Sequence, residues 1–481
     1  MEVQRVLLFG ILLTACAGAS ESHLRDELSQ AALRLAPIDE SEAKAPEIDG
    51  SIASYVGFAL AQSPALRASY ERWRATTLRI AATRTLPDPV VSYGYFARSV
   101  QTRVGPQRHR LGIRQSFPWP SRLRSAATAQ SARALAAQKR FEARAMTLVG
   151  SVSEAWWRLW WIRRAREVQN EQLEILTGLV EALRGGMETG RVLLADVSQV
   201  DLRRSRLRDA IEGLREDETS AEAALRGVLG TGAPAVLPTL GEDALSLPAE
   251  SLEELSQAVR EHPFIQAYGQ LAEAADAQAD ALWADRLPRF TIGADWIETG
   301  ARAAAGDESG DDAVIVSVGL SVPLWQGARA DEQHAAEADA YAERAEQEHA
   351  EDGAIAELHR ALAAVRDSHR RVHLYRHTLL PQAQSVYESV TGAYVVGQGS
   401  VASTLLAQRE LLELALGVER ALAEHGVAWA QLERVTGRTL ARDVSNVVSN
   451  DVSNDEAPVG DAPVAPNAPL QDENGNELDH D

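Results

Sequence analysis

The spacing of apolar residues changes twice in each half of the chain. Residues 51–84 and 251–286 are Ala-rich, follow a helical spacing and end before Pro87 and Pro288. Two stretches with an apolar residue at every second position follow in each half, which predicts strands with one apolar and one polar face. The apolar rows are Val91, Tyr93, Tyr95 and Ala97; Leu111, Ile113 and Phe117; Phe290, Ile292, Ala294 and Trp296; and Val314, Val316, Val318, Leu320 and Val322. The pattern therefore predicts four strands in two hairpins.

A long helix-forming segment follows each predicted hairpin. Residues 119–185 and 325–392 are each about 67 residues long and contain only Pro120 and Pro381 as prolines. At about 1.5 Å per residue, such a helix measures about 100 Å. Shorter helices of about 36 residues are predicted at 192–226 and 401–435. Two short helices placed end to end match one long helix, which predicts a wall of helices packed in coiled-coil fashion.

The two halves repeat one another in order. Four short motifs of the first half recur in the second, as the pairs Pro64 and Pro263, Pro87 and Pro288, Pro118 and Pro323, and Gly190 and Gly397. Their offsets are 199, 201, 205 and 207 residues, and this ordered series predicts one duplicated unit rather than several unrelated domains. We expect a first repeat at 51–230, a linker at 231–250 and a second repeat at 251–440.

The length of the predicted strands suits a membrane. A strand of about ten residues, tilted by about 45°, covers roughly 23 Å, close to the apolar band of an outer-membrane barrel. The opposite strand faces carry small or charged residues, as a water-filled interior requires. Four strands do not close a barrel, and open strand edges are not tolerated in lipid. If the sheet spans a membrane, several chains must share one barrel.

The N-terminus has the features of an export signal. A short apolar stretch at residues 6–15 ends in Leu13-Thr14-Ala15-Cys16 and is followed by polar sequence. This resembles a bacterial lipoprotein signal, which implies removal of residues 1–15, acylation of Cys16 and, with Ala17 next, sorting to the outer membrane. An ordinary secretory signal with an incidental cysteine is the alternative. Residues 16–50 are expected to be a linker.

Composition and charge exclude several classes of protein. The net charge of −21 argues against nucleic-acid binding. Ten acidic residues and no Lys or Arg lie in residues 443–481, so much of this charge belongs to a tail, residues 441–481, that is expected to be disordered. No apolar run after the N-terminus is long enough for a membrane helix. A single cysteine excludes internal disulfides, Cys-based zinc sites and iron–sulfur clusters.

The duplicated junctions Phe117-Pro118-Trp119-Pro120-Ser121 and Val322-Pro323-Leu324-Trp325-Gln326-Gly327, with Gly-led helix tips at 190–196 and 397–401, resemble the TolC family of outer-membrane efflux proteins over about residues 51–440. The resemblance implies a mainly α, internally duplicated fold with a membrane β-barrel part. It also implies a homotrimer that shares a twelve-stranded barrel, four strands per chain, continued by a long periplasmic α-helical barrel.

The function implied by this resemblance is a passive exit duct of a tripartite efflux or type I export system. The implied partners are a periplasmic adaptor, an inner-membrane pump of RND or ABC type, and the lipid of the Gram-negative outer membrane. In the family the helix tips form the periplasmic aperture and contact the adaptor, which makes Gly190, Arg191, Asp196, Gly397, Gln398 and Gly399 the candidate tip residues. Ser400 and Ser403 stand where family members often carry acidic residues, so only Asp196 is expected to supply an acidic ring.

Other side-chain patterns have structural readings. His369, His373 and His377 recur every four residues, a spacing that can hold a metal and would suit heavy-metal efflux, but arginines crowd them and no carboxylate completes a shell. We therefore expect no metal site. Four tryptophans at 156–161 are expected to pack between helices rather than to stack on a ligand. Arg98, Arg108, Arg110 and Arg114 are either paired with Asp295, Asp307, Asp311 and Asp312 or independently solvated.

The sequence contains no recognisable catalytic or nucleotide-binding constellation, so neither an enzyme nor a cofactor is expected. One hypothesis from another class remains open. A periplasmic structural lipoprotein of stacked coiled coils would form no pore and would place the four alternating segments in a small soluble sheet. The unbroken apolar row from Val314 to Val322 favours the duct.

Overall fold

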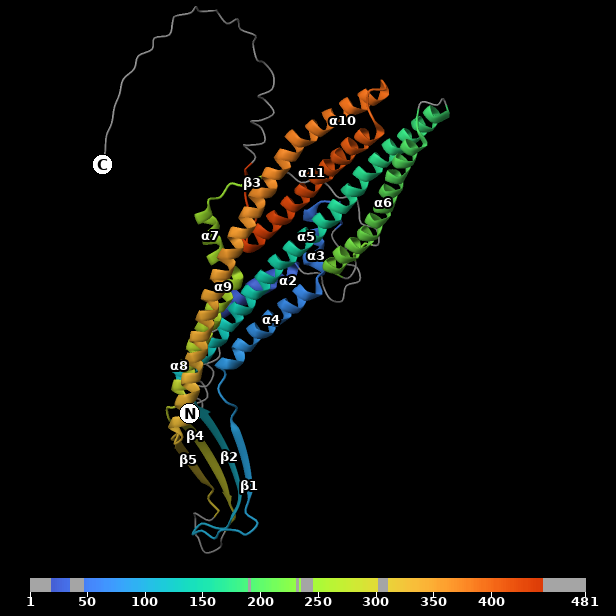
Figure 1. The fold of residues 1–481 in the computed structure, drawn as a ribbon. Coiled ribbons are helices and arrows are strands. Elements are labelled where there is room, and N and C mark those ends of the chain that lie inside the picture. Colours follow the sequence, from blue (N-terminus) through green and yellow to red (C-terminus); the bar gives the residue numbers. More distant parts are fainter. Residues whose placement is uncertain are drawn as a thin grey trace, which may run out of the picture.

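The structure is a computed structural model that describes residues 19–34, 47–188, 192–230, 233–234, 245–301 and 310–443. The molecule is elongated, with a four-stranded sheet at one end and long helices running away from it (Figure 1). Within the described ranges, no helix has the length and apolar character needed to cross a membrane.

Each repeat opens with a helix that is broken by a proline. The first repeat has α3 (Ile52–Gln62) and α4 (Pro64–Arg84), and the second has α7 (Leu252–Arg260) and α8 (Pro263–Ala284). The spacing of apolar residues predicted one continuous helix in each place. The side chains of Ser63 and His262 cap the second helices by accepting bonds from the N–H groups of Leu66 and Phe264. Proline has no N–H to continue the preceding helix, so a new helix begins there.

The predicted long helices are confirmed. The first repeat continues with α5 (Pro120–Glu188), which is 69 residues long, and α6 (Leu194–Leu229). In the second repeat, α9 (Gln326–Leu374), the π-helical turn η2 (Tyr375–Leu379) and α10 (Leu380–Val395) follow one another, and α11 (Val401–Thr436) returns. The π turn was not predicted. Pro381 cannot donate a hydrogen bond to the carbonyl of His377, and a π turn accommodates that lost bond by widening the helix locally.

The four predicted strands are confirmed as one antiparallel sheet. They are β1 (Val90–Tyr95), β2 (Gln107–Phe117), β4 (Arg289–Thr299) and β5 (Ala313–Ser321), in the order β1-β2-β4-β5. Strands β2 and β4 join the two hairpins, with Leu111 opposite Trp296 and Gly112 opposite Asp295. Strand β1 has only six residues, fewer than predicted, because the chain leaves the ladder after Tyr95 and forms a loop closed by a bridge between Gln101 and Pro106.

Two smaller elements lie outside the repeated pattern. Strands β3 (Leu247–Pro248) and β6 (Arg442–Asp443) pair, which ties the segment between the repeats to the end of the second repeat. Helix α2 (Ala19–Arg34) lies within residues 16–50, where a linker was expected. Its Leu24 is buried against Ile80 of α4 and Ala134 of α5, and this packing explains why the segment is helical. The signal segment 1–15, Cys16 and the tail after Asp443 lie outside the described residues.

The buried residues form separate clusters along the length of the helices. One cluster joins α3, α5 and α6 around Trp156, Trp157 and Trp160, whose rings meet edge to face at 4.9 and 5.3 Å. A second cluster joins α7, α8, α9 and α11, and a third joins the far ends of α5 and α6 to α11. The expected packing role of the tryptophans is therefore confirmed. The clusters give a wall one or two helices thick, not a globular domain.

Candidate functional site

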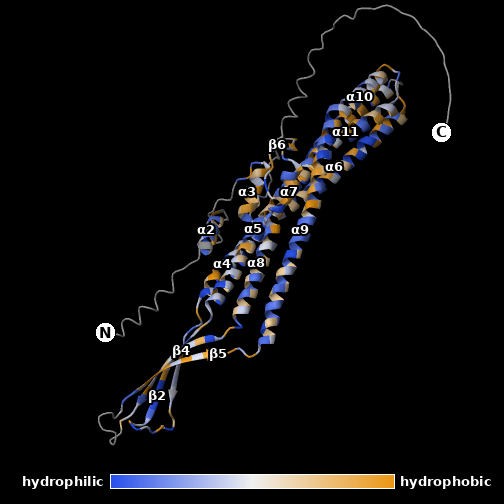
Figure 2. Cartoon of the chain, turned by 90° about the vertical axis from the view of Figure 1, so that its left-hand side faces the viewer, coloured by the Kyte–Doolittle hydropathy of each residue, from blue (hydrophilic) through white to orange (hydrophobic). Residues whose placement is uncertain are grey.

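One face of the sheet is apolar and uncovered by any described part of the chain. On β5, Val314, Val316 and Val318 are 70%, 73% and 76% exposed, and Val91 and Tyr93 on β1 are similarly open. In Figure 2 the strands carry both hydrophobic and hydrophilic segments, as expected for a sheet with one apolar and one polar face. Such a patch of large apolar side chains requires a partner phase or a partner protein. Leu111 and Ile113 on β2 and Ile292 on β4 are about half exposed and lie between these two edge strands, so the patch is a continuous band.

Aromatic residues lie at both ends of this band. At the loop end, the hydroxyl of Tyr93 lies 2.7 Å from Nδ1 of His109, the two rings stack at 5.8 Å, and the indole N–H of Trp296 donates to Asp312 at 3.1 Å. At the helix end, Trp119 meets Phe290 edge to face and Trp325 is 78% exposed. Rings with an apolar body and a polar tip favour the boundaries of a membrane.

The opposite face of the sheet is polar and holds an ion pair between the hairpins. Nε and Nη2 of Arg110 on β2 each lie 3.0 Å from a different carboxylate oxygen of Asp295 on β4, and Asp295 is only 3% exposed. Paired charges between the hairpins, one of two sequence-based readings, are thus confirmed at this position. Asp312 instead accepts bonds from the N–H of Thr299 and the indole of Trp296. Asp307 lies outside the described residues.

The reversal between α10 and α11 is built on two glycines. Gly397 has φ +78°, and the N–H groups of Gly397 and Gln398 donate to the carbonyls of Tyr394 and Ala393 at 3.0 and 2.9 Å. These two bonds form a Schellman cap, in which a left-handed residue closes a helix. A Cβ on Gly399 would lie 2.8 Å from the backbone nitrogen of Tyr394. The prediction that glycine is needed at this tip is confirmed.

The second tip lies at the same end of the molecule (Figure 1). Gly190 and Arg191 are outside the described residues, so their place at this tip stays a prediction. Asp196 lies in the first turn of α6. Burial raises the pKa of Tyr394 on α10, and the negative charge of Asp196 raises it further. The sequence-predicted tip residue Asp196 is therefore close enough to the α10 end to act on it electrostatically.

Sequence reasoning missed the exposed apolar residues of the two tips. Leu193 and Leu194 precede or begin α6 and are 71% and 68% exposed, while Val395 and Val396 end α10 and are 78% and 69% exposed. The residues of the third core cluster, by contrast, are buried. The sequence did carry a signal for them. At each tip, two adjacent large apolar residues stand beside a reversal that contains glycine.

The three histidines do not form one site. The ring of His369 lies 6.1 Å from that of His425 on α11, whereas His373 and His377 approach each other at 4.8 Å across the start of the π turn. Within the ranges that the structure covers, no group of three or more His, Cys, Asp or Glu side chains is placed to hold a metal ion.

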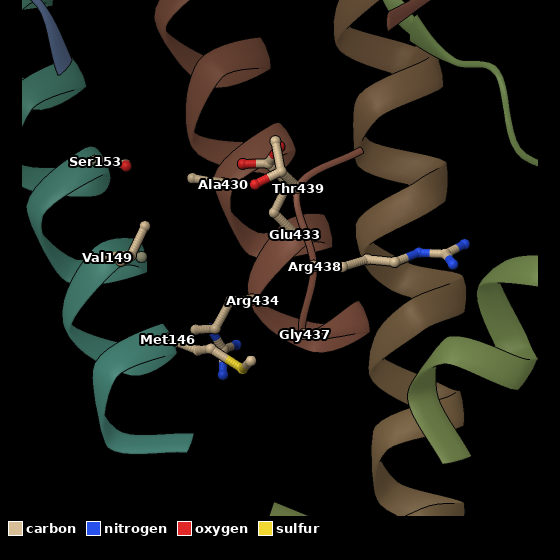
Figure 3. Close-up of a pocket in the computed structure, with 10 residues that line it drawn as sticks. Met146, Val149, Ser153, Ala430, Glu433, Arg434, Gly437, Arg438 and Thr439 are labelled. Atoms are coloured by element: carbon tan, nitrogen blue, oxygen red, sulfur yellow. The ribbon is translucent and has the colours of Figure 1, made fainter. Parts of the chain in front are cut away.

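A pocket of about 210 Å³ lies between α5 and the end of α11 (Figure 3). Its charged groups are engaged elsewhere: Arg434 pairs with Glu357 of α9, Glu433 accepts a bond from the N–H of Leu440, and Arg438 reaches the carbonyl of Glu254. In Figure 3 the side chain of Arg438 points away from Met146 and Val149. The charged groups around the pocket are therefore engaged in structural contacts, and we interpret the pocket as a gap in the packing of the helices.

The chain combines duplicated helices and hairpins, an uncovered apolar band with aromatic ends and a reversal built on two glycines, an arrangement suited to a protein of the outer membrane. The chain belongs to the outer membrane efflux protein family, whose model matches residues 56–231 and 255–438. The two matched stretches correspond to the two repeats. The TolC-type resemblance drawn from the sequence is thereby confirmed.

The chain is similar to individual members of this family and fold. It is 25% identical to the outer membrane efflux protein BepC of Brucella suis over 58% of this chain and 61% of that protein. Among solved structures, a membrane protein from Pseudomonas aeruginosa matches with a TM-score of 0.70 and 18% identity, over 86% of this chain and 97% of the other. The outer membrane protein VceC of Vibrio cholerae matches with a TM-score of 0.66 and 19% identity, over 81% and 97%.

Proposed function

We propose that the chain is one protomer of a trimeric, passive exit duct through the outer membrane. The observation that carries this proposal is the sheet, which has an apolar face and two outer edges: in the described residues, β1 pairs only with β2 and β5 only with β4. Unbonded backbone groups are expensive in lipid. Joining β5 of one copy to β1 of the next removes both edges, and three copies give twelve strands.

In the same assembly, the two faces of the sheet contact different media. The apolar band meets lipid, and the face with Arg110 and Asp295 meets the water of the interior. The long helices continue the barrel as a periplasmic tube. A passive duct needs a wet interior and an end that opens, and it needs no reacting group. A pore-free coiled-coil lipoprotein, the rival reading, leaves the exposed valines of β5 in water.

The helix tips are the proposed docking end for a periplasmic adaptor, which links the duct to an inner-membrane pump of RND or ABC type. Leu193, Leu194, Val395 and Val396 offer the apolar contact area, beside Gly190, Arg191, Asp196, Gly397, Gln398 and Gly399. Apolar anchors carry much of the binding energy of an interface. Val396→Asp is expected to weaken capture of the adaptor encoded with this chain, while Val316→Ala on the lipid band leaves that capture unchanged.

Acylation of Cys16 is the proposed second membrane anchor. The carboxylate of Glu21 on α2 is bonded to Arg84 at 3.0 Å, and Arg84 lies at the end of α4, just before β1. Cys16 precedes Glu21 by five residues, which span at most about 18 Å. The acyl chains on Cys16 would therefore lie close to the end of the sheet that joins the helices. Mass spectrometry of the mature N-terminus should find acyl chains on Cys16 and none in Cys16→Ser.

The assembly is tested by the mass of the detergent-purified protein. Three protein copies per particle, by light scattering that subtracts the detergent, are expected. A monodisperse monomer that stays soluble without detergent contradicts the duct, because its valine band would then tolerate water.

A further inference from the structure

The interior face of the sheet carries more positive than negative charge. By the register of the strands, β2 places Arg110 and Arg114 on the face opposite the apolar band, and β4 places Arg289 and Asp295 there. Strands β1 and β5 contribute no charged residue. Glu298 of β4 stands opposite His109 on the other face and does not offset this charge in the interior.

Among the four described strands, Asp295 is the single carboxylate on the interior face, and its charge is already neutralised. Asp295 is 3% exposed and both of its oxygens are held by Arg110 at 3.0 Å. The guanidinium of Arg114 lies 4.0 Å from the same carboxylate, beyond hydrogen-bonding distance, and its side chain is 49% exposed. Two bonds from one guanidinium fix a carboxylate in place. The charge of Arg114 is therefore directed to the water of the interior.

Two glycines make room for this arrangement. A Cβ on Gly112 would lie 2.3 Å from a carboxylate oxygen of Asp295, and a Cβ on Gly293 would lie 3.1 Å from Cγ of Arg114. The Asp295 carboxylate and the Arg114 stem thus lie flat across neighbouring strands. Side chains packed onto the sheet in this way have a fixed position in the lumen. Arg114 is held at one depth of the barrel in each copy.

We propose that Arg114 makes the barrel anion-selective, so that the duct favours anionic solutes such as carboxylates over cations. The proposal rests on the proposed duct function. Fixed charges in a pore with low-dielectric walls raise the local concentration of the opposite charge, and rings of Arg or Lys select anions. The tip adds no opposing ring from the second repeat, because residues 389–408 contain no Asp, Glu, Lys or Arg.

The test is the reversal potential of single channels of the full-length protein in planar bilayers under a gradient of KCl at low ionic strength. The wild-type duct should pass chloride in preference to potassium. Arg114→Gln removes one charge from each of the three copies and should lower the chloride-to-potassium permeability ratio by roughly twofold or more. Arg114→Lys should keep the ratio. Glu298→Gln changes a charge of the opposite face and is the matched control, with no effect expected.

The outcomes separate this inference from the function on which it rests. A conducting duct that prefers potassium, or an unchanged ratio in Arg114→Gln, overturns the anion selectivity and leaves the duct in place. A correctly assembled trimer that never conducts overturns both. The wild-type reversal potential keeps the inference falsifiable even if Arg114→Gln does not assemble, because a preference for potassium overturns it.

Discussion

Among the glycines of the described helices, Gly426 leaves the least room for a side chain, and its replacement gives a quantitative test of the helical wall. A Cβ at this position of α11 would lie 1.9 Å from Cε2 of Trp157 on α5. The indole is held in place on its other side, because Trp157 is 5% exposed and lies edge to face against Trp156 and Trp160. Gly426→Ala must therefore move either the indole or the helix.

The magnitude follows from two opposing terms. Alanine favours a helix interior by up to about 1 kcal/mol over glycine. Overpacking a closed core costs typically about 1–3 kcal/mol, and occasionally more. The overlap here is close to a covalent distance, so the upper part of that range applies. We expect a net destabilisation of roughly 2 kcal/mol.

The assay is thermal unfolding of the purified protein, followed by the near-ultraviolet circular dichroism of its tryptophans. Gly426→Ala should lower the melting temperature. Gly213→Ala in α6 is the matched control, because no atom lies within 4 Å of the added Cβ, and it should leave the melting temperature unchanged or raise it. Trp157→Leu in the Gly426→Ala background removes the overlapping ring, so the double variant should lose less than the sum of the single losses. Equal melting temperatures for Gly426→Ala and Gly213→Ala would refute the reasoning.

Three further outcomes follow from local contacts. Gly397→Ala places a Cβ at a left-handed residue, which costs about 1–2 kcal/mol, so hydrogen exchange should become faster at the α10–α11 tip and stay unchanged in α5. Ser251→Ala removes the capping box of α7 and should cost about 1 kcal/mol, measured against Ser256→Ala in the same helix. Burial holds the pKa of His262 below its ordinary 6.5, so its contribution to stability is complete above that pH and declines as the pH falls. His262→Gln should flatten the acid side of the curve of melting temperature against pH, and an unchanged slope contradicts this assignment.

The sheet could be predicted because each strand has one apolar and one more polar face. An apolar residue at every second position from Val314 to Val322 predicts a strand, and the duplicated motifs set the order of elements. The length of β1 could not be predicted, because its end depends on a loop bridge between Gln101 and Pro106. The breaks before Pro64 and Pro263 carried a signal, a capping residue followed by proline, that the longer helical spacing concealed.

At the helix tips, too, some features could be predicted from the sequence and others could not. Gly397 was predictable because a tight reversal needs a left-handed residue, and the chain offers glycine there. The exposure of Leu193 and Val396 was not, because large apolar residues near helix ends are buried in most folds. The Arg110–Asp295 pair depends on the register of β2 against β4, which joins residues 185 positions apart. Spacing alone left pairing and independent solvation equally open.

The central claim, that three chains enclose a water-filled duct, is tested most directly by single-channel recording of the purified, full-length protein in planar bilayers. The account predicts discrete, reproducible conductance steps from particles that contain three chains. Particles of verified trimeric mass that insert into the bilayer and give no conductance, with the adaptor present or absent, contradict it.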